Sequence, residues 1–184
     1  MTQLVLAANT VGASKLCLVN SAPSTAITNT ANETVFDQFY TFPSQSQRST
    51  QPTTLIRLKA YGIYSTGLVN LGLTLRVRWG GLSGTLLCSS GSITLAVSAN
   101  NSGWFVDSMI LIQGIGAGGM MESQGYASFT AGAVSVNALS MANAGTFSVD
   151  MTGASDLVVT AQWGTAAAAN SIQMRTCVID IDGP

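Results

Sequence analysis

Charged residues are scarce in this sequence. Asp, Glu, Lys and Arg make up 8% of its 184 residues, whereas about a quarter is usual for globular domains. The formal net charge is −1, so neither a basic nucleic-acid surface nor an acidic tail is indicated. Ser, Thr, Asn, Gln and Gly supply the polarity instead. Such a surface resists aggregation poorly in free solution, and it suits a protein that packs against copies of itself or a larger assembly.

Histidine is absent altogether. Its absence excludes Ser-His-Asp and Cys-His catalysis as well as imidazole metal sites. The three cysteines, Cys17, Cys88 and Cys177, are far apart and form no CxxC spacing, so a zinc-finger type of site is not expected. We expect buried, reduced cysteines made in a cytosol; one disulfide plus one free thiol is the alternative. No metal or other cofactor is predicted.

Long apolar runs are also missing. The most apolar stretch, residues 109–121, is broken by Gln113 and four glycines and is shorter than the roughly 20 residues of a membrane-spanning helix. The first residues lack the basic region and longer apolar run of a signal peptide. The length suits one domain. We expect residues 24–184 to form that domain and residues 1–23 to be an N-terminal arm or a first strand.

A period of two residues dominates the hydrophobic pattern. In residues 71–79, Leu71, Leu73, Leu75, Val77 and Trp79 fall on one face of a strand, and Thr74, Arg76 and Arg78 fall on the other. The same alternation puts Ile56, Leu58, Ala60 and Gly62 opposite Arg57, Lys59 and Tyr61. Inward residues of further strands are Ile93, Leu95, Val97; Trp104, Val106, Ser108, Ile110, Ile112; Leu157, Val159, Ala161, Trp163; and Ile172, Met174, Thr176, Val178. Residues 34–42 and 119–130 are predicted as two more strands.

Turn-forming clusters separate these runs. They include Gly80-Gly81, Ser90-Gly91, residues 100–103 and 143–145, and Thr152-Gly153. Eight to ten strands at this spacing, without a helical pattern, predict an all-β, antiparallel sandwich or barrel. Residues 166–169, four alanines, are predicted to be a loop, and residues 43–52 an exposed polar loop.

Two candidate chemical motifs fail on inspection. Residues 114–119 match G-x-G-x-x-G, but a strand-like run follows the glycines where a dinucleotide site needs a helix, so a turn between two strands is predicted. Among the carboxylates, Asp180 and Asp182 share one strand face. We interpret them as solvent-exposed residues near the end of the chain and not as a catalytic pair. No pair is marked for glycosidase chemistry, and we expect the protein not to be an enzyme.

A candidate docking patch consists of Arg57, Lys59, Arg76 and Arg78. Alternation places each pair on one strand face, and the four would form one basic patch if the two strands were neighbours. Like charges opposed in a sheet are destabilising, so an acidic partner surface would then be expected. A solvated outer face is the alternative. The aromatic interleaving that stacks bases is missing, so nucleic acid is not expected.

The aromatic residues have two interpretations. They could line a sugar-binding site, or each could fill the core or an end of the sandwich, since all lie on alternating strands or at strand ends. The residues concerned are Trp79, Trp104, Trp163, Tyr40, Tyr61, Tyr64 and Tyr126.

Five segments carry a resemblance to a known class of protein: STAITNTANETVFDQ (24–38), LIRLKAYGIYS (55–65), LTLRVR (73–78), DLVVTAQWG (156–164) and NSIQMR (170–175). In style and order, over roughly residues 24–181, they resemble β-sandwich virion proteins of tailed bacteriophages, of the head decoration (cement) type. The resemblance carries no site motif, so no functional residue is transferred.

The resemblance implies a jelly-roll-like sandwich and a non-enzymatic structural protein of the virion. Such a protein would be assembled in the host cytoplasm, form a homotrimer, bind the major capsid protein and stabilise the outside of the head. Neither nucleic acid nor a membrane is expected as a partner. The alternative is a tail or fibre module that binds a receptor or a carbohydrate.

Overall fold

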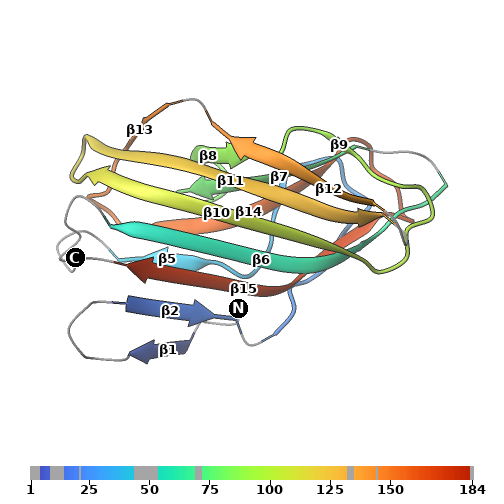
Figure 1. The fold of residues 1–184 in the computed structure, drawn as a ribbon, viewed down its shortest axis with the longest axis horizontal. Helices are drawn as coiled ribbons and strands as arrows, with labels where there is room; N and C mark the ends of the chain where they lie inside the picture. Colours follow the sequence, from blue (N-terminus) through green and yellow to red (C-terminus); the bar gives the residue numbers. More distant parts are fainter. Residues whose placement is uncertain are drawn as a thin grey trace.

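The protein folds as two packed antiparallel β-sheets (Figure 1). The computed structural model describes residues 5–8, 15–20, 22–43, 54–68, 72–131, 135–143 and 145–182. Fifteen strands lie in these ranges and no residue in them is helical, so the described part has no helix that could cross a membrane. The predicted all-β sandwich is confirmed.

The larger sheet has nine strands and forms the front layer in Figure 1. Its strands follow the order β1 (Val5–Ala8), β2 (Lys15–Val19), β15 (Ser171–Asp182), β6 (Leu55–Ser65), β10 (Ser102–Gly114), β11 (Gly119–Ala131) and β12 (Ser135–Ala142). Two short strands join it at the side, β13 (Phe147–Val149) on β11 and β3 (Ile27–Thr28) on β15. The first two strands therefore extend the sheet beyond β15.

The smaller sheet has six strands and lies behind the first. Its order is β4 (Thr34–Val35), β14 (Ser155–Trp163), β7 (Gly72–Trp79) and β8 (Thr85–Ser89), with β5 (Tyr40–Phe42) on β14 and β9 (Ile93–Thr94) on β7. The pairing is nested along the chain. β6 pairs with β15 in one sheet, and β7, which follows β6, pairs in the other sheet with β14, which precedes β15. Nested pairing across two sheets is the jelly-roll feature.

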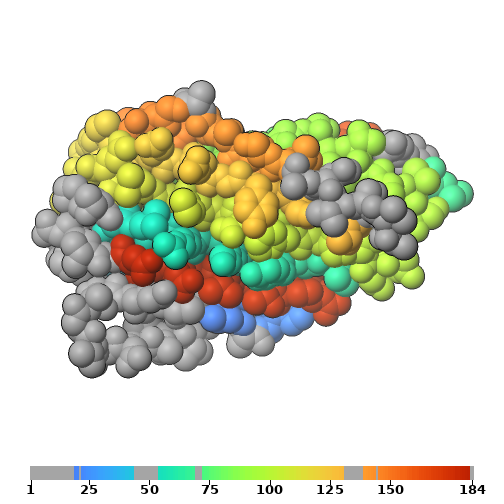
Figure 2. Space-filling model, in the orientation of Figure 1, coloured from blue at the N-terminus to red at the C-terminus, as the bar shows by residue number. Residues whose placement is uncertain are grey.

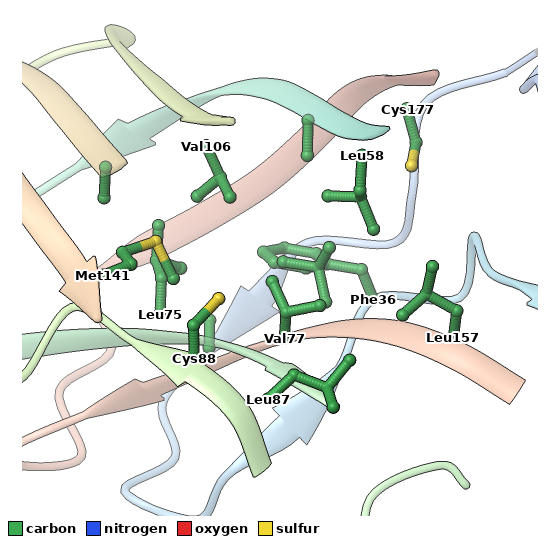
Figure 3. Packing of buried hydrophobic residues seen from close by; sticks show 14 of the residues in the cluster. Phe36, Leu58, Leu75, Val77, Leu87, Cys88, Val106, Met141, Leu157 and Cys177 are labelled. Carbon is green, nitrogen blue, oxygen red and sulfur yellow. The ribbon is translucent and has the colours of Figure 1, made fainter. Parts of the chain in front are cut away.

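The core fills the space between the sheets. Figure 3 shows Leu58 and Val106, from the nine-stranded sheet, pointing toward Leu75 and Val77 of β7. The alternation predicted for β6, β7, β10 and β14 is confirmed, since the residues assigned to the inner faces within the described part are buried. The strand alternation in the sequence thus determines which side chains meet in the core.

The buried cysteines are unpaired thiols, as predicted for Cys88 and Cys177. Burial raises the pKa of Cys88 to about 11 and the pKa of Cys177 to about 12. Both therefore stay protonated at neutral pH. The side chain of Cys17 lies outside the described residues.

Two strand predictions are wrong. Residues 34–42 form two short strands, β4 and β5, separated by residues 36–39. The Phe36 amide still donates to the carbonyl of Val159 on β14, and its buried ring stacks on that of Trp104, with centroids 5.5 Å apart. The strand predicted around residues 93–97 is limited to Ile93–Thr94, and Val97 is exposed beside Ser98, whose φ is 54°. Ten strands have four residues or more, within the predicted number, and five are shorter.

The face predicted for the second half of β15 is also wrong. The register shifts between Met174 and Thr176, which marks a β-bulge. A bulge adds one residue to one strand, so every later side chain points to the opposite face. Cys177 and Ile179 are consequently buried, while Thr176 and Val178 lie on the outer face.

The loop predictions have different outcomes. Residues 166–169 form a turn as expected, with the amide of Asn170 donating to the carbonyl of Ala167. Of the loop predicted for residues 43–52, only Pro43 lies within the described ranges.

Candidate binding face on the nine-stranded sheet

The four basic residues of the candidate docking patch do not form one patch. Arg57 and Lys59 lie on β6 in the nine-stranded sheet, whereas Arg76 and Arg78 lie on β7 in the six-stranded sheet. Their side chains point away from the core, so the two pairs occupy opposite outer faces of the sandwich. The single patch required β6 and β7 to be neighbours in one sheet, and they are not.

Arg76 and Arg78 share an acidic partner within the chain, Glu33. The Arg78 guanidinium donates to both carboxylate oxygens, at 2.7 and 2.9 Å, and Arg76 Nη1 lies 3.2 Å from Glu33 Oε2. Thr160 on β14 donates to the same carboxylate at 2.5 Å. The three charged side chains are 17–19% exposed. Both arginines thus already have an acidic partner in the chain, and one positive charge of the cluster is left over.

This ion-pair cluster sets the protonation of Glu33. Burial on its own raises the pKa of a carboxyl group, but the hydrogen bonds from Arg78 and Thr160 and the charges of Arg76 and Arg78 outweigh it. The pKa of Glu33 is therefore held below its usual range, and the cluster remains ionised at neutral pH.

Arg57 and Lys59 lie on a face of mixed charge. Arg57 is 3.9 Å from Asp182, and both side chains are largely exposed. Lys59 is directly opposite Asp107 of β10 in the strand register. Neither residue makes this face basic.

A row of three aromatic side chains crosses the same face. The ring centroids of Tyr61 and Phe105 are 4.8 Å apart, and those of Phe105 and Tyr126 are 5.4 Å apart. The three residues come from the adjacent strands β6, β10 and β11. Tyr61 is 40% exposed and Tyr126 is 45% exposed. We call these three residues the aromatic row.

The strand pattern explains which aromatics reach the surface. Trp104 and Val106 face the core, so the residue between them, Phe105, must face outward. Sequence reasoning did not single out Phe105, although this alternation was the signal that could have found it. Of the aromatics considered for a sugar site, Trp79, Trp104, Trp163 and Tyr64 are buried in the core, Tyr40 is partly buried, and Tyr61 and Tyr126 are exposed.

Hydrogen-bonding side chains surround the aromatic row. Tyr126 is opposite Asp107, which is opposite Lys59, and Phe105 is opposite Ser128. One step further along the strands, Gln124 is opposite Met109. Within the described residues, the side chains of Lys59, Asp107 and Gln124 form no hydrogen bond or ion pair. They are free to bind a ligand.

A hollow of about 220 Å³ lies on the same face. It is lined by Leu55, Met109, Leu111, Glu122, Ser123 and Gln124. These residues come from β6, β10 and β11, the strands that carry the aromatic row. Figure 2 shows this side of the molecule, with β6, β10 and β11 running across it. The row and the hollow together form the candidate binding face.

No protein-family model and no curated protein matches the sequence. Three solved structures resemble the fold. A protein of unknown function from Shewanella oneidensis MR-1 has a TM-score of 0.43 at 12% identity, over 98% of this chain and 75% of that one. The CBM2 module of the evolved Dit of Lactobacillus casei BL23 phage J-1 has a TM-score of 0.33 at 13% sequence identity, and the match covers 90% of this chain and 77% of that one. A winged bean acidic lectin, complexed with methyl-α-D-galactose, has a TM-score of 0.33 at 9% sequence identity, and the match covers 98% of this chain and 91% of that one. At these TM-scores, function has to be argued from the face itself.

The remaining candidate motifs lie outside the aromatic row and the lining of the hollow. The glycines of residues 114–119 form the turn between β10 and β11, as predicted, with Gly116 at a φ of 97°. Asp180 is opposite Arg57 at the end of β15. Among the described residues, no group of three or more Cys, Asp or Glu side chains could hold a metal ion.

Proposed function

We propose that this protein is a non-enzymatic carbohydrate-binding module that binds sugars on the outer face of its nine-stranded sheet. The observation that carries the proposal is the aromatic row, in which the ring of Phe105 contacts those of Tyr61 and Tyr126, two exposed tyrosines. Aromatic rings left exposed in a contiguous group commonly mark a site of interaction.

The chemistry of the face suits a sugar ring. A pyranose has C–H groups on its faces, which pack on aromatic rings, and hydroxyl groups around its rim. Lys59, Asp107 and Gln124 supply donors and acceptors beside the row, and their side chains are free within the described residues. A mostly apolar floor with a few polar groups around it is the usual composition of a small-molecule site.

Nucleic acid fits the same face less well. Bases also stack on aromatic rings, but nucleic-acid affinity depends on neutralising phosphates with Lys and Arg. Here Lys59 is opposite Asp107, and Glu122 lies on the same face, in a chain with a net charge of −1. The face lacks the required positive potential.

Replacing Tyr126 with Ser is expected to weaken glycan binding at least about tenfold, a loss of roughly 1.4 kcal/mol of binding free energy. Tyr61→Ser should act in the same direction. Titration calorimetry against soluble oligosaccharides selected on a glycan array measures the effect. Both tyrosines are well exposed, so the fold should be unaffected.

Leu82→Ser is the matched control. Leu82 is 45% exposed, as Tyr126 is, but it lies outside the binding face, between β7 and β8. Its replacement should leave binding unchanged. The proposal is wrong if the wild-type protein binds no glycan, or if the control lowers affinity as much as Tyr126→Ser does.

A head decoration protein is the second candidate, and β1 favours it. This four-residue strand, Val-Leu-Ala-Ala, ends the nine-stranded sheet and pairs only with β2 among the described strands. It contains neither charge nor proline, the residues that usually keep an edge strand from pairing with another chain. Together with the scarcity of charge, this edge supports assembly with copies of the chain or with capsid subunits, as the resemblance to phage decoration proteins implies.

Cosedimentation with undecorated heads tests that second candidate. The protein should pellet with the heads, and light scattering should show an oligomer, a trimer if the resemblance holds. Ala7→Lys puts a charge on β1 and should reduce both. If the protein is a monomer and does not bind heads, the decoration hypothesis is wrong. The carbohydrate-binding proposal is then unaffected, because β1 and the aromatic row are separate.

A further inference from the structure

We infer that the hollow beside the aromatic row accepts the acetamido group of an N-acetylated sugar. The inference rests on the proposed carbohydrate binding and names the class of sugar. An acetamido group consists of a methyl group, an N–H donor and a C=O acceptor. The face must therefore offer an apolar surface, an acceptor and a donor close to one another and next to a stacking ring.

The apolar surface is formed by Leu55, Met109 and Leu111. Leu55 and Leu111 are opposite each other in the register of β6 and β10, and Met109 is 41% exposed. An acetamido methyl group placed against these side chains would leave water. A hollow of about 220 Å³ has room for this small group.

The acceptor and the donor come from β11. Glu122 accepts a hydrogen bond on Oε2 from the Gln113 amide at 2.9 Å, which leaves Oε1 free within the described residues. This oxygen is suited to the acetamido N–H. The Gln124 amide is also unpaired within the described part, and its NH₂ group can donate to the acetamido C=O.

The hollow is within reach of a sugar stacked on the row. Gln124 and Tyr126 are two residues apart on the same face of β11, a separation of about 7 Å along a strand. Met109 is opposite Gln124, and Asp107 is opposite Tyr126. A pyranose stacked on Tyr126 therefore has one edge directed to the hollow, where a ring substituent can enter it.

Matched sugars test this inference. Oligomers of N-acetylglucosamine and N-acetylgalactosamine are compared by calorimetry with the corresponding glucose, galactose and de-N-acetylated oligomers. At least one N-acetylated ligand should bind about tenfold or more tightly than its counterparts, since one well-placed methyl group alone distinguishes ligands about 10-fold or more. Tighter binding of the de-N-acetylated, cationic sugar would mean that Glu122 acts as a simple counter-ion and would overturn the inference.

Two variants separate the hollow from the row. Glu122→Gln removes the charged acceptor with little change of size, and Leu111→Asn makes the apolar surface polar at similar volume. Each should reduce the preference for the N-acetylated ligand, measured as the ratio of its dissociation constant to that of the hydroxyl counterpart, about tenfold. If both ligands bind equally to the wild-type protein, the inference fails while the proposed carbohydrate binding stands. If neither binds, both fail.

Discussion

Replacing Gly62 with Ala should lower the free energy of unfolding by about 3 kcal/mol or more, at the upper end for overpacking a core. Gly62 is buried on β6, between Trp104 of β10 and Met174 of β15 in the register. A Cβ atom there would overlap the backbone carbonyl oxygen of Gln173 and lie 2.5 Å from Nε1 of the Trp104 indole.

Neither obstacle can move cheaply. The Gln173 carbonyl belongs to β15, and it accepts a hydrogen bond from the Trp104 indole at 3.2 Å. Trp104 is in turn stacked on Phe36, with centroids 5.5 Å apart. Displacing the indole therefore breaks a partly buried hydrogen bond and disturbs the aromatic packing between the sheets.

Gly153→Ala is the control for this change. No atom lies within 4 Å of the Cβ that it would add, so its stability should stay within about 0.5 kcal/mol of the wild type. Urea denaturation followed by fluorescence compares the variants. Equal midpoints for the two alanine variants would show that β6 and β15 are not packed around Gly62 as described.

Much of the fold follows from the alternation in the sequence. The inward residues of β7, β10 and β14 are predicted correctly because alternate side chains along each of these stretches stay on one face, with no bulge between the first and the last of them. The pattern fails where the backbone is irregular. Nothing in the residues around Arg175 indicates the bulge in β15, and nothing in residues 34–42 indicates that the strand is interrupted between Val35 and Tyr40.

The site shows the same limit. Alternation is enough to predict that Arg57, Lys59 and Tyr61 face outward, because this is a property of one strand. It does not give the order of the strands. β6 pairs with β10 instead of β7, so Tyr61 meets Phe105 instead of the arginines of β7. Contacts between distant strands depend on topology, and a single sequence carries little information about that.

Glu33→Gln should destabilise the protein by about 2 kcal/mol at neutral pH. Removing one partner of a fully buried ion pair costs about 3–5 kcal/mol, and the cost is smaller here because the charged side chains of the cluster keep 17–19% of their exposure. Arg76 and Arg78, two residues apart on one face of β7, would remain as like charges without their shared carboxylate.

The loss should also depend on pH, in a direction given by the pKa of Glu33. The folded protein holds that pKa below its usual range, whereas an unfolded chain has a Glu pKa of about 4.3. Below about pH 4.3 the unfolded state thus binds more protons than the folded state at this residue. The stabilisation by Glu33 is complete above the unfolded pKa and is lost as pH falls through the folded pKa. The difference in the free energy of unfolding between the wild type and Glu33→Gln should therefore become smaller at acidic pH.

Asp182→Asn separates this cluster from ordinary surface charge. The Asp182–Arg57 pair is exposed and long, at 3.9 Å, so its removal should change stability by less than about 1 kcal/mol. Thermal unfolding of the three proteins between pH 3 and pH 7 compares them in one series. The prediction is wrong if Glu33→Gln is as stable as Asp182→Asn at neutral pH, or if its stability difference from the wild type stays constant at acidic pH. Glu33 would then not stabilise the outer face of the six-stranded sheet. The arginines of β7 would then again be free to bind an acidic partner.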